Sequence, residues 1–310
     1  MRGRALLLFA LCCLLWGSTW MVIKIGLEDL PPFLFGGVRM AIASVALIPI
    51  ALRSWRRLSS REWAWIGAAG FFQLGLSYAG VFASERFISS SLAATLFCSY
   101  PIWVMALAHL WVPGERATLL HAGSALLGIL GIVILEAPLV GPVTLNRQVA
   151  LAMMLPLGAA VCSALGGVLQ KRHLGSVPVT VNLWAQTAIG AGVLLSLHLL
   201  LGANQTAHWT PRAFAALLYL AIPGTVVTFL ALFWLFPRVP MALIGAIPLI
   251  DTVVAIALGA IILGEQVDWR LGLGGAFVLA GAALASRIRV DAPSASESPT
   301  NRDSAQGDVG

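Results

Sequence analysis

The chain has 310 residues, of which 59% are hydrophobic and 10% are charged, with a mean hydropathy of +0.90 and a formal net charge of +6. Soluble domains carry about 25% charged residues, so this composition excludes an ordinary soluble fold and indicates an integral membrane protein. The basic balance then fits cytoplasmic loops better than a nucleic-acid partner. The four cysteines lie in apolar runs, without a CxxC pair or a histidine at metal-ligand spacing, so we expect no disulfide, metal or cofactor.

Segments long enough to cross a bilayer recur along the whole chain. A transmembrane helix needs about 20 predominantly apolar residues, and this length predicts about ten helices at 5–26, 33–52, 63–84, 89–111, 118–137, 148–170, 180–201, 212–235, 240–263 and 269–286. The first segment begins like a signal peptide. Its apolar run is long enough to span, however, and no A-x-A site follows, so we expect an uncleaved helix. The tail 291–310 is rich in Ser, Pro and Asp and is predicted to be disordered.

The chain also resembles itself at an offset of 150 residues. This shift aligns Cys12 with Cys162, Gly17 with Gly167, and Gly114-Glu115 with Gly264-Glu265. It also superimposes the first five predicted helices on the last five. A repeat with an odd number of spans must be followed by an inverted copy, so we predict an all-α integral membrane protein of two inverted five-helix repeats, residues 1–143 and 144–290. Inverted repeats typically enclose a mid-membrane pathway that each side reaches in turn, which predicts a secondary transporter.

The distribution of basic residues predicts the orientation. With the N-terminus in the cytoplasm, most lysines and arginines outside the spans fall on the cytoplasmic side, including Arg53, Arg56 and Arg57. The positive-inside rule therefore places both termini and the tail in the cytoplasm.

One acid interrupts the apolar stretch "LIGAIPLIDTVVAIALGAII". Asp251 lies about 16 Å from either end of its predicted helix, where a charge costs about 2.5–3.5 kcal/mol on insertion scales. Pro248, one turn earlier, removes a backbone N–H, and broken backbone at this depth is tolerated only against protein or water. Asp251 is therefore either a proton-coupling or substrate-amine site in a wet cavity, or an acid paired with Lys24 or Arg39 for helix packing.

Other candidates lie on the first two predicted helices. Trp16, Trp20 and Lys24 share one helical face, which either lines the solute pathway or belongs to the outer interfacial belt. Lys24 is interpreted as a structural charge. Arg39 is also predicted to be structural, reaching the outer interface or Glu28, with a substrate carboxylate as the alternative partner.

Polar and aromatic residues on further helices complete the predicted substrate-binding set, which is Trp16, Trp20, Gln73, Tyr78, Tyr100, Trp103, Gln186 and Asp251. Polar groups in a bilayer should point inward, where they contact substrate or form ordinary interhelical hydrogen bonds. The segments 118–137 and 269–286 are rich in glycine and alanine and should pack closely between halves or protomers, in a monomer or homodimer.

Three stretches carry a resemblance to a known family. They are "LLWGSTWMVIKIGL" with "PPFLFGGVRM", "SYPIWVMALAHLWVPGE", and "ALIGAIPLIDTVVAIALGAIILGE". Together they resemble the EamA-type transporters of the drug/metabolite transporter superfamily. The resemblance implies ten helices in two inverted repeats, a central cavity, and export of small metabolites, often amino acids, across a bacterial inner membrane. One departure is that Asp251 aligns with Pro101 of the first repeat, while the proline of the second repeat is Pro248.

The predicted function is therefore a secondary transporter that exports amino acids or related amphiphilic solutes, with a small-molecule substrate and the lipid bilayer as partners. A multidrug or lipophilic-cation exporter is the alternative. An intramembrane enzyme is the alternative of another class, although the sequence has no H-E-x-x-H or G-x-S-x-G motif. The chain also lacks a P-loop, so a proton gradient or the solute's own gradient is the expected driving force.

Overall fold

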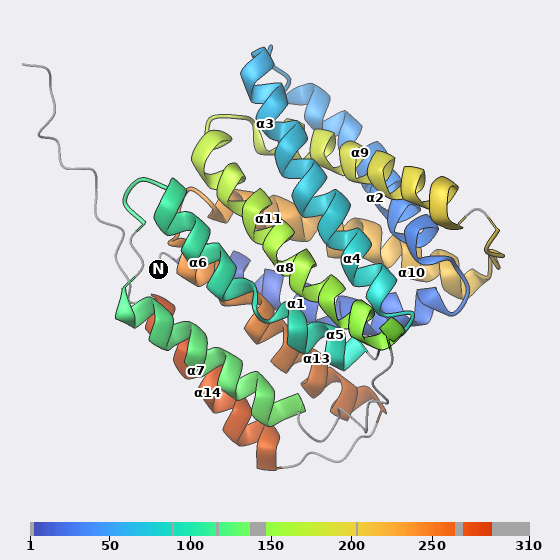
Figure 1. Ribbon diagram of the computed structural model, residues 1–310. Coiled ribbons are helices and arrows are strands. Elements are labelled where there is room, and N and C mark those ends of the chain that lie inside the picture. Colours follow the sequence, from blue (N-terminus) through green and yellow to red (C-terminus); the bar gives the residue numbers. More distant parts are fainter. Residues whose placement is uncertain are drawn as a thin grey trace, which may run out of the picture.

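The computed structural model describes residues 3–88, 90–115, 118–136, 147–202, 204–263 and 269–286. Within these ranges the chain is helical and contains no strand. The first half comprises α1 (Gly3–Leu27), α2 (Pro32–Arg53), α3 (Ser60–Gly70), η1 (Phe71–Leu76), α4 (Ser77–Ser84), α5 (Ser90–Phe97), α6 (Tyr100–Trp111) and α7 (Leu119–Glu136). The second half comprises α8 (Arg147–His173), α9 (Val179–Leu197), η2 (His198–Gly202), α10 (Pro211–Ala221), η3 (Ile222–Val227), α11 (Thr228–Leu235), α12 (Met241–Gly245), α13 (Ile247–Leu263) and α14 (Trp269–Ser286). Figure 1 shows these helices as one bundle.

Several helical stretches have the length and composition of membrane spans. Six described stretches qualify: Gly3–Leu27, Pro32–Arg53, Ser60–Ser84, Arg147–His173, Val179–Gly202 and Pro211–Leu235. Shorter apolar helices cover Leu119–Ile134, Met241–Ala255 and Leu273–Ala285. Helix ends agree with the sequence-based ranges to within a few residues, so the prediction of an all-helical membrane protein is confirmed. The predicted boundary at 143/144, Glu265 and the tail 291–310 lie outside the described residues.

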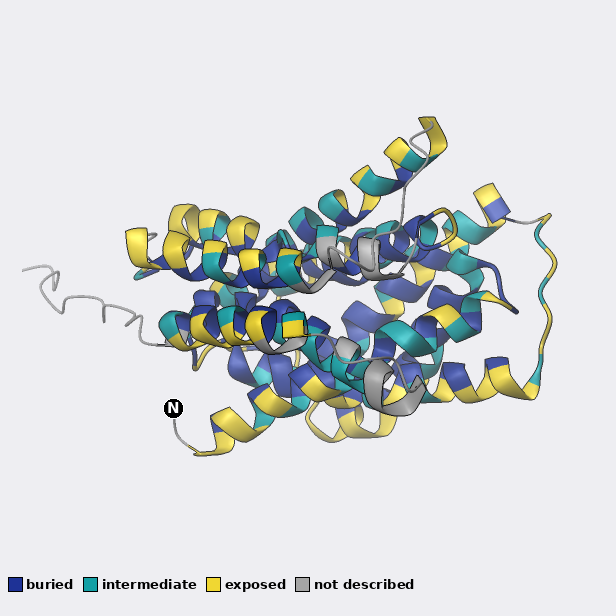
Figure 2. Cartoon of the chain, turned by 90° about the horizontal axis from the view of Figure 1, so that it is seen from below, coloured by how far each residue is buried: buried dark blue, intermediate teal, exposed yellow. Residues whose placement is uncertain are grey.

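The surface is apolar where a soluble protein would be polar. Leucines on the outer helix faces, such as Leu7, Leu14, Leu110 and Leu200, are exposed. Figure 2 shows exposed positions along the outward faces of the peripheral helices and buried positions facing inward. This arrangement is expected when lipid, and not water, surrounds the bundle.

Two long helices contain the same irregularity at equivalent positions. The run α3–η1–α4 is α-helical from residue 60, π-helical from 71 and α-helical again from 77. The run α10–η3–α11 has the same pattern, with the three segments beginning at 211, 222 and 228. Each of these starting points lies 151 residues after its counterpart. The N-caps also correspond, because the Ser59 and Thr210 hydroxyls accept hydrogen bonds from the N–H groups of Glu62 and Ala213. The two halves therefore share a local structure that the apolar sequence pattern does not reveal.

Two further helices are broken near their middle. The predicted segment 89–111 divides into α5 and α6, and 240–263 divides into α12 and α13. The breaks meet, because the Cys98 thiol donates to the Pro248 carbonyl at 3.7 Å and lies 3.5 Å from the Thr252 hydroxyl. Irregular backbone from both halves is thus concentrated at one place in the bundle.

The helices α7 and α14 lie side by side at one edge of the bundle (Figure 1). A side-chain carbon at Gly131 would lie 2.6 Å from the Gly274 carbonyl oxygen, and one at Gly281 would lie 2.7 Å from that of Ser124. The small residues therefore allow the close contact that their spacing predicts. Neither helix contributes a residue to the cavity described next.

Candidate functional site

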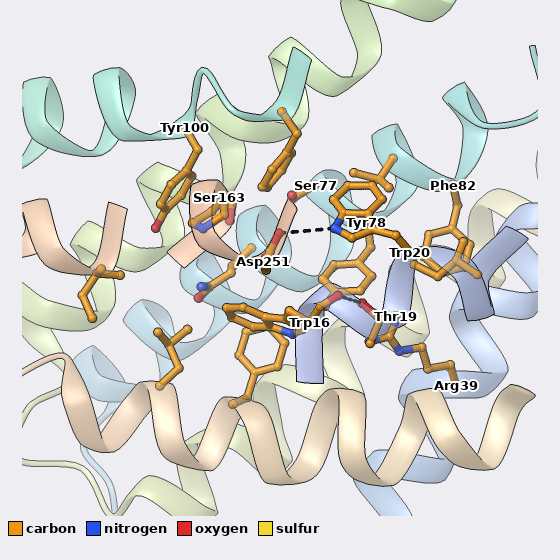
Figure 3. Close-up of a pocket in the computed structure, with 18 residues that line it drawn as sticks. Trp16, Thr19, Trp20, Arg39, Ser77, Tyr78, Phe82, Tyr100, Ser163 and Asp251 are labelled. Carbon is orange, nitrogen blue, oxygen red and sulfur yellow. Dashed lines mark hydrogen bonds between the residues drawn. The ribbon is translucent and has the colours of Figure 1, made fainter. Parts of the chain in front are cut away.

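A cavity of about 100 Å³ lies where the two halves of the chain meet. The first half lines it with Trp16, Thr19, Trp20, Ile23, Arg39, Gln73, Ser77, Tyr78, Val81, Phe82, Phe97 and Tyr100, and the second half with Ser163, Phe229, Leu232, Ile244, Pro248 and Asp251. Figure 3 shows these side chains converging on the same space from several helices. Among the described residues that line it, Arg39 is the only basic side chain and Asp251 the only acidic one. The structure therefore brings together six of the eight predicted substrate-binding residues.

Asp251 projects into this cavity from the first turns of α13, just after Pro248. Its side chain is buried, and Oδ1 accepts a hydrogen bond of 3.4 Å from the indole Nε1 of Trp20 (Figure 3). No lysine or arginine among the described residues forms an ion pair with it. The predicted pairing with Lys24 or Arg39 is thus not seen, and the carboxyl group faces the cavity.

A glycine allows α1 to pass close to Asp251. A side-chain carbon at Gly17 would lie 2.7 Å from the backbone carbonyl oxygen of Asp251 and 2.7 Å from Cβ of Val254. Such distances are far below van der Waals contact, so only glycine permits this approach of α1 to α13. The same approach places Trp16 and Trp20 beside the acid.

Arg39 projects into the cavity from α2 and is 1% exposed. Its Nε donates to the Leu220 carbonyl at 3.1 Å and to the Thr225 hydroxyl at 2.9 Å, and its Nη2 donates to the Gly224 carbonyl at 3.1 Å. The guanidinium carbon lies 5.0 Å from the centroid of the Tyr78 ring. Nη1 has no partner with hydrogen-bond geometry.

The π-helical segment η3 explains how Arg39 is held. The wider π turn and Pro223 disturb the regular backbone ladder, which leaves carbonyls available to side chains. Arg39 donates hydrogen bonds to the carbonyls of Leu220 and Gly224, and Trp16 Nε1 also donates to the Gly224 carbonyl at 3.3 Å. Arg39 does not contact Glu28, because Glu28 pairs with Arg212 at 2.7 Å.

Aromatic rings form most of the cavity wall. Trp16 lies edge-on to Phe229 with ring centroids 5.2 Å apart, and Phe97 stacks on Tyr100 at 6.0 Å. Trp20 contacts Phe97 edge-on at 6.3 Å. The wall is therefore mostly apolar, with Arg39 and Asp251 set into it.

Amide groups occupy two different environments. Gln73 lies in η1 and lines the cavity, and its buried Oε1 has no hydrogen-bond partner. Gln186 lies outside the cavity, where its Nε2 donates to Gln170 Oε1 at 3.0 Å and to Asn182 Oδ1 at 2.8 Å. Gln186 therefore belongs to an interhelical amide network in this structure.

Two other predicted residues also lie away from the cavity. Trp103 is 39% exposed on α6. Lys24 is exposed and lines a separate depression of about 600 Å³ with Glu28, Asp29, Glu85, Arg86 and neighbouring residues. We call this depression the vestibule and its side of the bundle the Asp29 end. Along α1 the vestibule comes after the cavity, since Trp16, Trp20 and Ile23 line the cavity and Lys24, Leu27 and Glu28 line the vestibule.

Contacts between the two halves also occur at the Asp29 end. Arg212 pairs with Asp29 through Nη2 at 3.0 Å, and the Thr210 hydroxyl donates to Asp29 Oδ2 at 2.7 Å. The hydrogen bonds from Arg212 are the largest cause of a pKa of Asp29 below its usual value.

The opposite side, which we call the Glu115 end, is closed by a buried ion pair. Lys171 Nζ lies 2.6 Å from Glu115 Oε1 and also donates to the Val239 carbonyl at 2.6 Å. The same carboxylate oxygen accepts the N–H of Met241 at 3.1 Å. This network joins the first half, after α6, to α8 and the start of α12 in the second half. The vestibule therefore opens at the Asp29 end, whereas a buried ion pair joins the two halves at the Glu115 end.

Several cavity residues escaped the sequence-based prediction. They are mainly apolar or small, such as Thr19, Ser163, Phe229 and Leu232. Apolar residues occur on every face of these helices, so neither the helical spacing nor the internal repeat distinguishes the residues that face the cavity from those that face lipid. Among residues of known placement, no cluster of three His, Cys, Asp or Glu side chains could hold a metal ion.

Comparison with known proteins agrees with this architecture. The model of the EamA-like transporter family matches residues 3–136 and again 150–287. The chain is 25% identical over 271 residues to the uncharacterized transporter YoaV of Bacillus subtilis (strain 168), covering 86% of this chain and 91% of that protein. It is 29% identical over 285 residues to the uncharacterized inner membrane transporter YedA of Escherichia coli (strain K12), covering 88% and 90%.

A third relative and one solved structure extend the comparison. The probable amino-acid metabolite efflux pump of Salmonella typhimurium (strain LT2) is 27% identical over 285 residues, covering 87% of this chain and 91% of that protein. One crystal structure superimposes with a TM-score of 0.78 at 20% identity, covering 92% of this chain and 97% of that chain, and so shares the fold. Because the family model matches both halves of the chain, this protein belongs to the EamA-like transporter family of membrane transporters.

Proposed function

We propose that the protein is a secondary transporter that works by alternating access, with the central cavity as its solute site. The observation that carries this proposal is the cavity itself, which receives a buried charge from each half of the chain, Arg39 and Asp251. In the proposed arrangement ten spans form two inverted five-helix repeats. The double match to the family and the repeated π-helical segments, 151 residues apart, support the duplication. Inversion follows from the odd number of spans in each repeat.

The proposed orientation places the Glu115 end and both termini in the cytoplasm of a multi-pass inner membrane protein. The positive-inside rule supports this assignment, and a relative is named an inner membrane transporter. The vestibule at the Asp29 end then faces outward. In this proposal the molecule is in an outward-facing conformation, and the buried Glu115–Lys171 pair closes the cytoplasmic side.

For the solute, we propose small amphiphilic metabolites, with amino acids first, moved outward. Aromatic walls with two charges suit a small molecule with an apolar side chain, and one relative is named a probable amino-acid metabolite efflux pump. A lipophilic cation is the second candidate, because Asp251 is a buried acid among Trp16, Trp20 and Tyr100.

Flux into proteoliposomes tests the proposal. Amino acids and organic cations are offered as a panel at several internal pH values, to the wild type and to Asp251→Asn. We expect solute-specific flux by the wild type, and loss of flux or of its pH dependence in Asp251→Asn. Glu28→Gln is the matched control, because it removes an acid that is exposed at the vestibule. Absence of flux for every solute would refute the transporter assignment, and unchanged flux in Asp251→Asn would refute the role of the acid.

A further inference from the structure

We infer that the cavity selects zwitterions, with Arg39 binding the carboxylate of the solute and Asp251 binding its ammonium group. This inference rests on the proposed function and narrows its solute class. It assigns to Arg39 a direct role in recognition in addition to its hydrogen bonds to η3.

The first step of the argument concerns charge. Arg39 is 1% exposed and Asp251 is 4% exposed, and within the described part of the chain neither forms an ion pair. Burying an isolated charge is costly unless an opposite charge and hydrogen bonds compensate for the lost water. A lipophilic cation would compensate Asp251 and leave Arg39 uncompensated. A zwitterion supplies one opposite charge to each residue.

The second step concerns hydrogen-bond capacity. Three contacts to Leu220, Gly224 and Thr225 fix the guanidinium of Arg39, and Nη1 remains free. A free donor on a rigid guanidinium is suited to a carboxylate oxygen, because little side-chain freedom is lost on binding. At the other residue, the hydrogen bond that Asp251 accepts from Trp20 is long, at 3.4 Å, and the carboxylate has further acceptor positions for an ammonium N–H.

The third step concerns placement. In the view of Figure 3 the Tyr78 ring, 5.0 Å from the Arg39 guanidinium carbon, lies between Arg39 and the Asp251 carboxylate, with Trp16 near them. A solute held at both ends would therefore lie along aromatic rings, which suits an apolar side chain. Gln73 Oε1 is a further free acceptor on the cavity wall for the ammonium group.

The two residues also come from different halves of the chain, Arg39 from α2 and Asp251 from α13. A zwitterion that contacts both forms a bridge between the halves. Molecules with only one charge cannot form this bridge, so binding and the movement of one half against the other would be linked for zwitterions alone.

The test measures binding by the purified full-length protein in detergent, as the ligand-dependent shift of its thermal unfolding temperature. The twenty common amino acids are screened first. The tightest binder is then compared with its own amino-acid amide, which lacks the carboxylate charge, and with its 2-hydroxy acid, which lacks the ammonium charge. We expect each analogue to bind the wild type about 10- to 100-fold more weakly, as for loss of a charge-assisted hydrogen bond.

Two variants exchange these preferences. Asp251→Asn should bind the amino acid and its 2-hydroxy acid equally while still discriminating against the amide. Arg39→Gln keeps an N–H donor for the η3 carbonyls and should show the opposite pattern. If Arg39→Gln fails to fold, Arg39→Lys replaces it and should keep the preference for a carboxylate. Equal loss of both preferences in each variant would indicate a structural role and overturn the inference.

A second readout separates this inference from the proposed function. Proteoliposomes are loaded with an amino acid or with methyl viologen, a permanent organic cation. Flux of methyl viologen without binding of any amino acid would overturn the zwitterion site and leave the transporter assignment intact. Absence of flux for both would overturn both proposals. Equal binding of the amino acid, the amide and the 2-hydroxy acid by the wild type would overturn the inference without any variant.

Discussion

The buried ion pair at the Glu115 end gives a quantitative prediction for Glu115→Gln. Lys171 and Glu115 have side chains that are 12% and 5% exposed, with 2.6 Å between Nζ and Oε1. Removing one partner of so buried a pair costs about 3–5 kcal/mol, because the remaining charge stays buried. Glutamine still offers an oxygen to the Met241 N–H, and Lys171 keeps the Val239 carbonyl. We therefore expect Glu115→Gln to destabilise this closed conformation by the lower end of that range, about 3 kcal/mol.

In the proposed alternating-access cycle, this cost falls on one conformation of the transporter. When the Glu115 end opens, the two charges separate into water, where the substitution of Glu115 has little effect. The full difference therefore shifts the equilibrium toward the conformation open at this end. At about 1.4 kcal/mol per tenfold change, 3 kcal/mol corresponds to about a hundredfold shift in population.

A reporter cysteine measures this shift. Ile244 lines the cavity and is 1% exposed in the closed structure. In a background whose native cysteines are replaced by alanine, Ile244→Cys is labelled with a membrane-impermeant maleimide added at the Glu115 end, the side that we propose to be cytoplasmic. Glu115→Gln should increase the labelling rate strongly, and adding Lys171→Met should reverse much of the increase because no unpaired charge then remains buried.

The control variant is Glu28→Gln, which breaks an ion pair with Arg212 whose side chains are 56% and 51% exposed. Exposed pairs are worth about 0–1 kcal/mol, so the labelling rate should change little. The reasoning about the gate is refuted if Glu115→Gln is folded and labels Ile244→Cys at the wild-type rate. It is also refuted if Glu28→Gln changes the rate as much as Glu115→Gln.

Two further predictions concern stability. Gly17→Val should lower the unfolding temperature in detergent and reduce flux, because the valine side chain would overlap the Asp251 carbonyl and Val254. Overpacking of this kind costs about 1–3 kcal/mol. An unchanged melting curve would contradict the close packing of α1 on α13. The second prediction concerns Asp29, whose folded-state pKa is lowered chiefly by hydrogen bonds from Arg212. These interactions stabilise the folded protein fully above the unfolded-state pKa of about 3.9. The stabilisation is lost as the pH falls through the lower folded-state pKa. Asp29→Asn should therefore lose less stability than the wild type between pH 5 and pH 3 in thermal melts, and parallel curves would contradict this contribution.

Much of the fold follows from hydrophobic length alone. Apolar runs of about 20 residues are the strongest pattern a bilayer imposes, and the helices end where charged or proline-containing turns interrupt them. For the same reason the identity of cavity residues was less predictable. In a chain that is apolar on every face, a residue such as Phe229 gives no periodic signal to tell lipid from cavity.

Of the two charged cavity residues, the sequence indicated the environment of Asp251 but not that of Arg39. Asp251 violates the apolar rule in mid-helix, so its burial at a cavity could be expected from the sequence. Arg39 was expected near the outer interface because its depth in α2 permits either direction. Its actual partners, the carbonyls of Leu220 and Gly224, lie about 180 residues away and are available only because η3 is π-helical. Local sequence patterns do not predict a π segment of this kind.

Four of the backbone irregularities, namely η1, η3 and the breaks before α6 and α13, have a common physical reason. The π-helical segments η1 and η3 contribute or anchor cavity residues, through Gln73 and through the Gly224 carbonyl. The breaks before α6 and α13 are followed at once by Tyr100 and by Pro248 and Asp251, which line the same cavity. Irregular backbone inside a membrane is stable only against protein or water. Each half thus supplies one of these π segments and one broken helix to the central cavity, and that cavity is where a polar solute could cross from one side to the other.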